Sequence, residues 1–166
     1  MKYIAIILLF IAQSCQKPIK NENSSSYVFT WVKDENDWNS DYVAVINSDP
    51  KDQGYGSLVS TLPVGFNDIN AHHSEHRFHE IKELFVNGFS GGRSFIVDLN
   101  DPKHPKLKKT FTNINQYTFP HSFERLPNGN VLATFQTVGQ GNNQVGGLVE
   151  ISPEGDFVRS SNASDP

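Results

Sequence analysis

The stretch Ala71-His72-His73-Ser74-Glu75-His76 places three histidines within five residues. A reduced copy, His121-Ser122-Phe123-Glu124, follows later in the chain. Three pairs of identical residues lie 48 positions apart, namely His73 and His121, Arg77 and Arg125, and Leu84 and Leu132. Asp-Pro and Pro landmarks recur after 52 and 51 residues at Asp49-Pro50, Asp101-Pro102 and Pro153. This spacing indicates an internal repeat of about 50 residues.

Apolar residues in the repeat come in short runs separated by Gly, Pro, Asn and Asp, without a sustained helical period. The runs that predict strands are Tyr27–Val32, Tyr42–Ile46, Leu58–Pro63, Glu83–Phe89, Ser94–Leu99, Leu107–Phe111, Asn130–Gln136 and Gly147–Ile151. Four short strands in each period of about 50 residues are typical of a propeller blade. We therefore expect an all-β fold of about two to three four-stranded β-propeller blades.

The length of the chain leaves such a propeller as an incomplete ring. Residues 27–166 span 140 positions, which is fewer than three periods, whereas propellers close with about four to eight blades. A further strand begins at Phe157-Val158-Arg159, shortly before the sequence ends. We expect the remainder of the propeller to come from missing sequence or from self-association, because an open edge strand would otherwise be exposed.

The N-terminus resembles a targeting segment. A basic start precedes the apolar run Tyr3 to Ala12, which is too short to span a bilayer as a helix. Cys15, the only cysteine of the chain, follows at the expected cleavage point, as in bacterial lipoprotein signals. This pattern predicts a signal peptide at 1–14, a lipid on Cys15, a flexible tether at 15–26 and the propeller domain at 27–166. The alternative is a plain secretory signal with a spare cysteine.

These features predict an exported protein, lipid-anchored to a membrane of the bacterial cell envelope on its periplasmic or outer-surface side. A net charge of -4 and a pI near 5.8, with Lys and Arg scattered along the chain, disfavour nucleic acid as a partner. A single cysteine excludes a disulfide within the chain.

A residue repeated at the blade period falls on one ring around a propeller axis, so His73 and His121 could share one ligand. Imidazole nitrogens suit copper, zinc or iron. In an extended strand His73, Glu75 and Arg77 point one way and His72 and His76 the other. If the backbone bulges at the adjacent histidines, His72 could join the site instead. Arg125 would share the side of Arg77. We expect two further histidines, His79 and His104, to face solvent.

A structural role for the repeated residues stands beside this metal-site hypothesis. The repeated His-Ser could bond to a neighbouring blade or cap a backbone group. The repeated arginines could bind an anion or form a salt bridge between blades. On this interpretation the chain is a non-catalytic binding module with structural histidines, or an inactive truncated fragment.

The motifs at 71–76, 84–89 and 92–99 resemble the selenium-binding protein/methanethiol oxidase family, as do Asp101-Pro102, Pro120–Phe123 and Leu126–Leu132. The resemblance implies a β-propeller and a copper-dependent oxidation of methanethiol to formaldehyde, hydrogen peroxide and sulfide. It implies His72, His73 and His121 as copper ligands. From their places in the sequence, we expect Glu75, His76, Arg77 and Arg125 to surround these ligands.

This chain departs from the family in two ways. Members that bind selenium carry cysteines just after the paired histidines, where this chain has Glu75-His76-Arg77 and its domain has no cysteine. Selenium binding through a thiol is therefore not expected. Members of the family are also much longer, and we expect the remaining portion to hold further histidines. The leading hypothesis is a lipid-anchored segment of a copper oxidoreductase that acts on small thiols.

Overall fold

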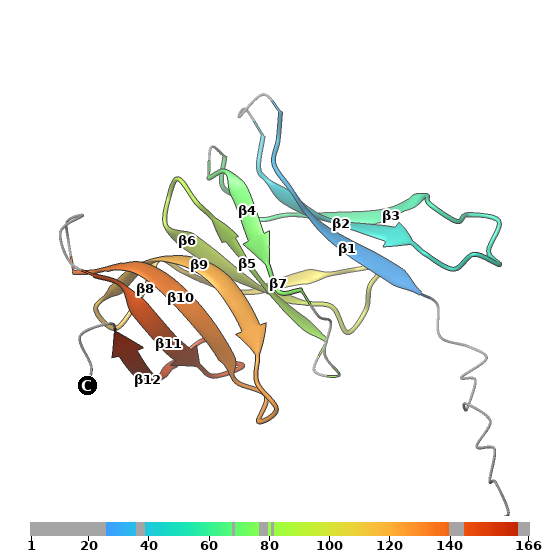
Figure 1. Cartoon of the computed structure of the whole chain (residues 1–166). Coiled ribbons are helices and arrows are strands. Elements are labelled where there is room, and N and C mark those ends of the chain that lie inside the picture. Colours follow the sequence, from blue (N-terminus) through green and yellow to red (C-terminus); the bar gives the residue numbers. More distant parts are fainter. Residues whose placement is uncertain are drawn as a thin grey trace, which may run out of the picture.

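The computed structural model describes residues 26–35, 39–67, 69–76, 80, 82–139 and 145–162. These residues form twelve strands in three antiparallel sheets (Figure 1). The rest of the described chain is turns and bends, so it contains no helix long and apolar enough to cross a membrane. The predicted all-β class is confirmed. The predicted signal peptide, Cys15 and most of the tether lie outside the described residues.

The first sheet contains β1 (Tyr27–Val32), β2 (Tyr42–Asn47) and β3 (Leu58–Pro63) in that order. Aromatic and β-branched residues fill β1, as expected for a pleated surface with one covered face. Phe29 and Trp31 of β1 pack on the core, whereas the intervening Val28 is 49% exposed. We call this sheet blade 1.

The second sheet, blade 2, contains β4 (Ala71–Ser74), β5 (Glu83–Gly88), β6 (Arg93–Asp98) and β7 (Lys106–Phe111). All six residues of β5 are buried. This burial explains the apolar runs Leu84–Val86 and Phe95–Val97 at the centres of β5 and β6, because both faces of these strands are covered by neighbouring sheets.

The third sheet, blade 3, has the order β12-β11-β10-β9-β8. Its strands are β8 (Asn113–Ile114), β9 (Tyr117–Arg125), β10 (Val131–Val138), β11 (Gly147–Ile151) and β12 (Phe157–Asn162). The short strand β8 pairs with the first residues of β9 and adds a fifth strand. The three sheets thus hold three, four and five strands, instead of the four in each that the sequence pattern predicts.

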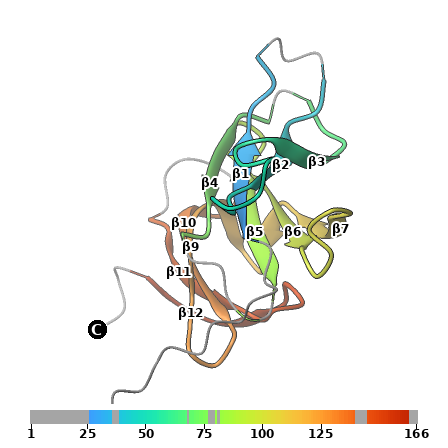
Figure 2. The ribbon, with the colours of Figure 1, turned by 90° about the vertical axis from the view of Figure 1, so that its right-hand side faces the viewer.

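Two apolar cores separate the three sheets. One core joins Leu84, Val86 and Phe95 of blade 2 to Val43 and other residues of blade 1. The other joins Phe85 and Ile96, on the opposite face of blade 2, to residues of blade 3 that include Phe123 and Val131. Blade 2 is therefore packed between its two neighbours, as are successive blades of a propeller (Figure 2).

A bulge at the same place in each sheet shows which strands of the three blades are equivalent. In each of the three sheets the last strand has one extra residue opposite the strand before it, at Val59, Lys108 and Val158. This register makes β2, β6 and β11 equivalent strands, and it makes β4 and β9 the innermost strands of blades 2 and 3. Strand β4 contacts both β1 and β9. Strand β4, which carries His72 and His73, therefore contacts both neighbouring blades.

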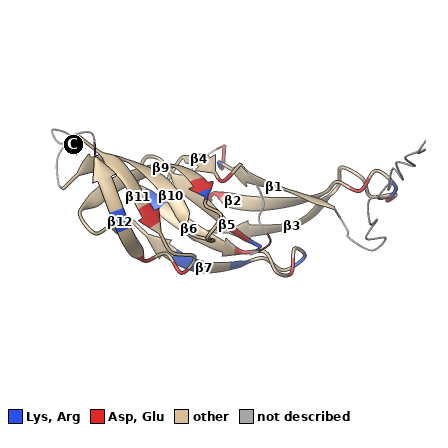
Figure 3. Ribbon diagram, turned by 60° about the horizontal axis from the view of Figure 1, so that its bottom comes forward, with Lys and Arg blue, Asp and Glu red and all other residues tan. Residues whose placement is uncertain are grey.

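Charged residues lie on strands of blades 2 and 3 and in the loops that connect the strands of blade 1. Figure 3 shows Lys and Arg positions interspersed with Asp and Glu positions in the described part of the chain. Several of them pair across blades 2 and 3, such as Lys109 with Asp156 at 2.8 Å.

Candidate metal centre

Three histidines from two blades converge at the inner edge of the molecule. His72 and His73 lie on β4 of blade 2, and His121 lies on β9 of blade 3. The Nε2 atoms of His72 and His121 are 3.2 Å apart. One nitrogen from each of the three rings lies within 4.8 Å of the other two. Within the described residues this trio is the one group of three or more His, Cys, Asp or Glu that could hold a metal ion.

A bulge in β4 explains how two consecutive residues reach the same place. Ala71 pairs with Gly88 and Ser74 with Val86, so His72 and His73 together lie opposite the single residue Asn87. Consecutive residues of a regular strand point to opposite faces, and a bulge removes that alternation. The ring centroids of His72 and His73 are consequently only 4.2 Å apart.

A matching bulge occurs in β9 of blade 3. Pro120 pairs with Phe135 and Phe123 with Ala133, so His121 and Ser122 together lie opposite Thr134. The two bulges occupy equivalent positions in the two innermost strands. Bulges beside functional sites often redirect a side chain, and here the same device occurs twice at the histidines.

The strand register changes which residues of the two repeat copies are equivalent. By the bulges, the equivalent of His121 is His72, 49 positions earlier, and not His73 at the step of 48. Leu84 and Leu132 are not equivalent either, because Leu84 is buried against blade 1 whereas Leu132 lines an outer groove of blade 3. The repeat of about 50 residues is real, but the step of 48 from His73 and from Leu84 does not follow the structural alignment. Arg77, the third residue with this step, lies outside the described residues.

Buried groups from blades 1 and 2 hold β4 from both sides. The Asp41 carboxylate of blade 1 is fully buried and accepts the amide of Ala71 at 2.7 Å and that of Asp34 at 3.0 Å. The Asn87 side chain accepts the amide of His73 at 2.7 Å. The backbone on each side of His72 is therefore fixed by a side chain from a different blade.

A buried ion pair joins β4 to β9 below the histidines. Arg125 donates through Nε and Nη2 to the two carboxylate oxygens of Glu75, each at 2.9 Å. Both side chains are almost fully buried, and the amide of Phe85 also donates to Glu75 at 2.8 Å. Burial raises the pKa of Glu75, while Arg125 opposes the shift. The pair is bidentate and sets the distance between the two inner strands.

The electrostatics of the site favour neutral imidazoles at His73 and His121. Partial burial, together with the adjacent histidines, lowers the pKa of His73, and burial and His72 lower the pKa of His121. Neutral imidazole is the form that binds metals.

The distance between two of the histidines suits a bound ion. Two nitrogens bound about 2.0 Å from one ion at a tetrahedral angle lie about 3.3 Å apart, close to the 3.2 Å between the Nε2 atoms of His72 and His121. The donor set therefore fits copper or zinc.

One side of the trio is open to solvent and lined by an aromatic ring. The side chain of His72 is exposed, and its ring centroid lies 5.0 Å from that of Phe89. The Phe89 ring is 6.1 Å from that of His121 and is 39% exposed. A small molecule that reaches the histidines would thus meet an apolar surface beside nitrogen donors.

The other described residues that were predicted for the site do not join the three histidines. Glu75 and Arg125 bind each other rather than the histidines, so Arg125 forms the salt bridge between blades that was one of the two alternatives. His76 is exposed, and Arg77 and His79 lie outside the described residues. His104 is exposed as predicted and contacts Asp101 at 2.8 Å.

Sequence reasoning missed Asn87, Asp41, Thr134 and Phe89. Asn87 is a polar residue directly after the apolar run Leu84–Val86, and a fully buried position there requires hydrogen-bond partners. That signal was available in the sequence. The roles of Asp41 and Thr134 depend on a neighbouring blade and on a bulge, which a single sequence does not reveal.

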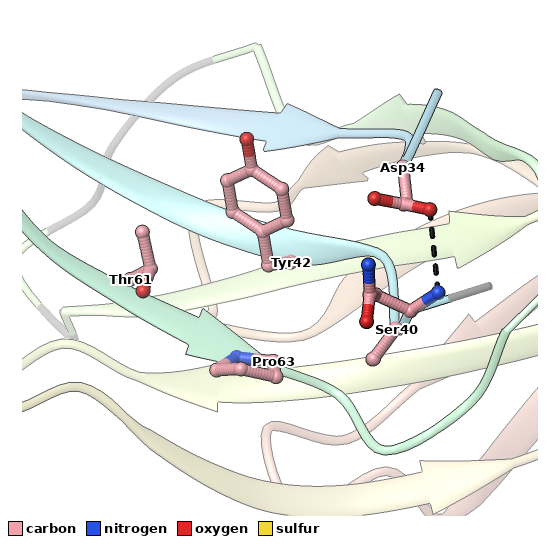
Figure 4. Close-up of a pocket in the computed structure, with 6 residues that line it drawn as sticks. Asp34, Ser40, Tyr42, Thr61 and Pro63 are labelled. Carbon is pink, nitrogen blue, oxygen red and sulfur yellow. Dashed lines mark hydrogen bonds between the residues drawn. The ribbon is translucent and has the colours of Figure 1, made fainter. Parts of the chain in front are cut away.

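A separate groove of about 450 Å³ lies at one end of blade 1 (Figure 4). Its lining residues are Asp34, Asn39, Ser40, Tyr42, Thr61 and Pro63. Asp34 accepts the amide of Asn39 at 3.3 Å. None of the three histidines lines this groove, which is therefore distinct from the candidate metal centre.

Comparison with known proteins assigns the chain to a family. The profile of the family described as 56kDa selenium binding protein (SBP56) matches residues 13–161. The chain belongs to this family. It is 29% identical to a methanethiol oxidase from Hyphomicrobium sp. over 170 residues, which cover 95% of this chain and 38% of that protein. The resemblance seen in the sequence motifs is thereby confirmed.

The fold is shared with a solved structure. The X-ray structure of a hypothetical selenium-binding protein from Sulfolobus tokodaii superposes with a TM-score of 0.63 at 18% identity. The match covers 78% of this chain and 32% of that one. The chain thus spans about two fifths of the curated relative and about a third of the solved one.

Proposed function

We propose that this SBP56-family chain contributes the histidine site of a copper-dependent oxidoreductase that acts on small thiols. The observation that carries the proposal is the convergence of His72, His73 and His121 from two blades. The similarity to a methanethiol oxidase supports a small thiol as substrate. Oxidation of methanethiol to formaldehyde, sulfide and hydrogen peroxide would consume one dioxygen and one water, so both are required as co-reactants.

The residues of this chain would divide the work as follows. His72, His73 and His121 would hold the ion as neutral ligands. Bound copper would supply one-electron redox chemistry and a coordination position for sulfur. Phe89 would cover the apolar part of the thiol beside the exposed face of His72. Glu75 and Arg125 would keep the two ligand-bearing strands together without contacting the substrate.

Further proposals concern the surroundings of the site. We place the protein in the bacterial cell envelope, anchored through a lipid on Cys15, on the basis of the N-terminal sequence pattern. The complete catalytic unit would include the rest of a propeller, supplied by further sequence or by self-association. Mass spectrometry of the mature N-terminus tests the anchor, and an unmodified Cys15 would contradict it.

Copper titration of the whole protein tests the central proposal. We expect binding of one Cu²⁺ per chain, weakened at least about 10-fold by His72→Ala, His73→Ala or His121→Ala, since each removes a direct ligand. His104→Ala is the matched control, because His104 is exposed and contacts Asp101 away from the trio. Equal binding by all four variants would contradict the proposal and favour a structural role for the histidines.

A further inference from the structure

Asn87 has no exposed surface and makes hydrogen bonds that reach all three blades. Its Oδ1 accepts the amide of His73 at 2.7 Å, and its Nδ2 donates to the carbonyl of Pro120 at 2.6 Å. Its backbone carbonyl accepts the indole N–H of Trp31 at 2.7 Å. One residue of β5 thus contacts β4, β9 and β1.

The two side-chain bonds of Asn87 fix the backbone at the histidines, one at His73 itself and the other at Pro120, which precedes His121. The bulge in β4 leaves the amide of His73 without its usual strand partner, and Asn87 supplies an acceptor in place of that partner. Pro120 immediately precedes His121, so the Nδ2 bond fixes the backbone that presents His121. The two ends of one amide group therefore fix the backbone positions of histidines from different strands.

In blade 3, the residue equivalent to Asn87 is Thr134, and its side chain binds only one strand. Thr134 lies opposite the β9 bulge as Asn87 lies opposite the β4 bulge, and its hydroxyl accepts the amide of Ser122 at 3.0 Å. A threonine hydroxyl is enough to satisfy the amide at a bulge. The additional NH₂ group of Asn87 has a different purpose, because it bridges to the neighbouring blade.

We propose that Asn87 is the positioning residue of the histidine site, setting the separation of His72 and His73 from His121 through its amide. This inference rests on the proposed function, since it assigns a role within the same metal centre. Asparagine suits the role because it offers an acceptor and a donor on one planar group. Aspartate would keep the acceptor for His73 but lose the donor to Pro120, and would add a buried charge.

Metal binding by Asn87 variants tests the proposal, with Cu²⁺ alone as the probe. Asn87→Ala and Asn87→Asp should weaken Cu²⁺ binding by about 10- to 100-fold, as is typical for residues that orient metal ligands. They should also change the hyperfine splitting in the electron paramagnetic resonance spectrum. Asn130→Ala is the control, because Asn130 donates to Glu150 at 2.7 Å within blade 3, and its spectrum should match that of the unmodified protein.

A measurement on the unmodified protein decides the matter if the variants fail to fold. The side-chain NH₂ of Asn87 should give two resolved, slowly exchanging signals by nuclear magnetic resonance, and both should shift on titration with diamagnetic Zn²⁺. Rapid exchange without a shift would overturn the proposal, as would an unchanged affinity and spectrum in a folded Asn87→Asp variant.

The outcomes distinguish the proposed role of Asn87 from the proposed copper-dependent function. If the unmodified protein binds no Cu²⁺, the proposed function and the role of Asn87 both fail. If the unmodified protein binds Cu²⁺ and Asn87→Asp binds it identically, only the role of Asn87 fails.

Discussion

The innermost strands β4 and β9 each have a bulge at a histidine, but different contacts hold the two bulges in place. Each strand has a bulge at a histidine, at His72-His73 in β4 and at His121-Ser122 in β9. The bulge in β9 is capped by Thr134 of its own sheet. The bulge in β4 is capped by Asn87, and the strand is fixed further by Asp41 of blade 1 and Arg125 of blade 3.

This difference shows that β4 depends more than β9 on contacts from other elements. Strand β4 has only four residues and pairs with a single strand of its sheet, so its own sheet offers few hydrogen bonds. Strand β9 has nine residues and pairs on both sides, with β10 and β8. We infer that substitutions around β4 disturb the histidine trio more than equivalent changes around β9.

The largest effect is expected from Arg125→Met. The substitution removes the partner of Glu75 and leaves that carboxylate buried between the blades, which should cost about 3 to 5 kcal/mol of unfolding free energy. Urea unfolding measures the loss. The double variant Glu75→Gln, Arg125→Met should recover part of it, because no buried charge then remains. A loss below about 1 kcal/mol, as for exposed ion pairs, would contradict this account.

A smaller loss is expected from Asp41→Ala, which removes the blade 1 contact with β4. The amides of Ala71 and Asp34 lose a buried charged acceptor, at a cost of about 2 to 3 kcal/mol. Hydrogen exchange should show faster exchange of the Ala71 amide, with little change in β10. Uniform acceleration across all three blades would show instead that Asp41 stabilises the whole fold and not β4 in particular.

Thr134→Val should have a milder and more local effect. Valine keeps the volume but lacks the hydroxyl that accepts the amide of Ser122, so we expect a loss of about 1 kcal/mol. Cu²⁺ binding should change less than it does in Asn87→Ala, because Thr134 fixes only β9 whereas Asn87 fixes both inner strands. Equal losses of copper affinity in the two variants would remove the proposed distinction between the strands.

The smallest effect concerns acid stability and Glu150, a buried glutamate of blade 3. Hydrogen bonds from Asn130, Arg159 and Asn128 lower the pKa of Glu150 below its ordinary value of 4.5. Its stabilising contribution is present above the unfolded pKa and is lost as pH falls through the folded one. Glu150→Gln should therefore show a shallower loss of unfolding free energy on acidification below pH 4.5. Identical pH profiles would contradict the assignment.

The all-β class and most strands could be predicted from the sequence because apolar runs alternate with turn residues. Strands such as Tyr27–Val32, Leu58–Pro63 and Gly147–Ile151 were predicted with the bounds that the structure shows. The short strand β4 and the long strand β9 were not predicted as strands. Both contain bulges and polar residues, which interrupt the periodicity on which such predictions rest.

The candidate site could be predicted in its residues but not in its geometry. The sequence repeat singled out His73 and His121, and the family resemblance added His72. The structure brings all three together but matches His121 with His72. The bulges shift the register by one residue, and this shift leaves no trace in the spacing of identical residues. The support from Asp41 and Asn87 depends on contacts between blades, which are distant in sequence.

The most direct test of the central claim is a count of nitrogen ligands in the copper-loaded protein. Electron paramagnetic resonance with ¹⁵N-labelled histidine should show superhyperfine coupling from His72, His73 and His121 together. His72→Ala and His121→Ala should each remove one coupled nitrogen, and His104→Ala should leave the spectrum unchanged. A spectrum that keeps the same nitrogens in all three variants would contradict the account, because copper would then bind elsewhere.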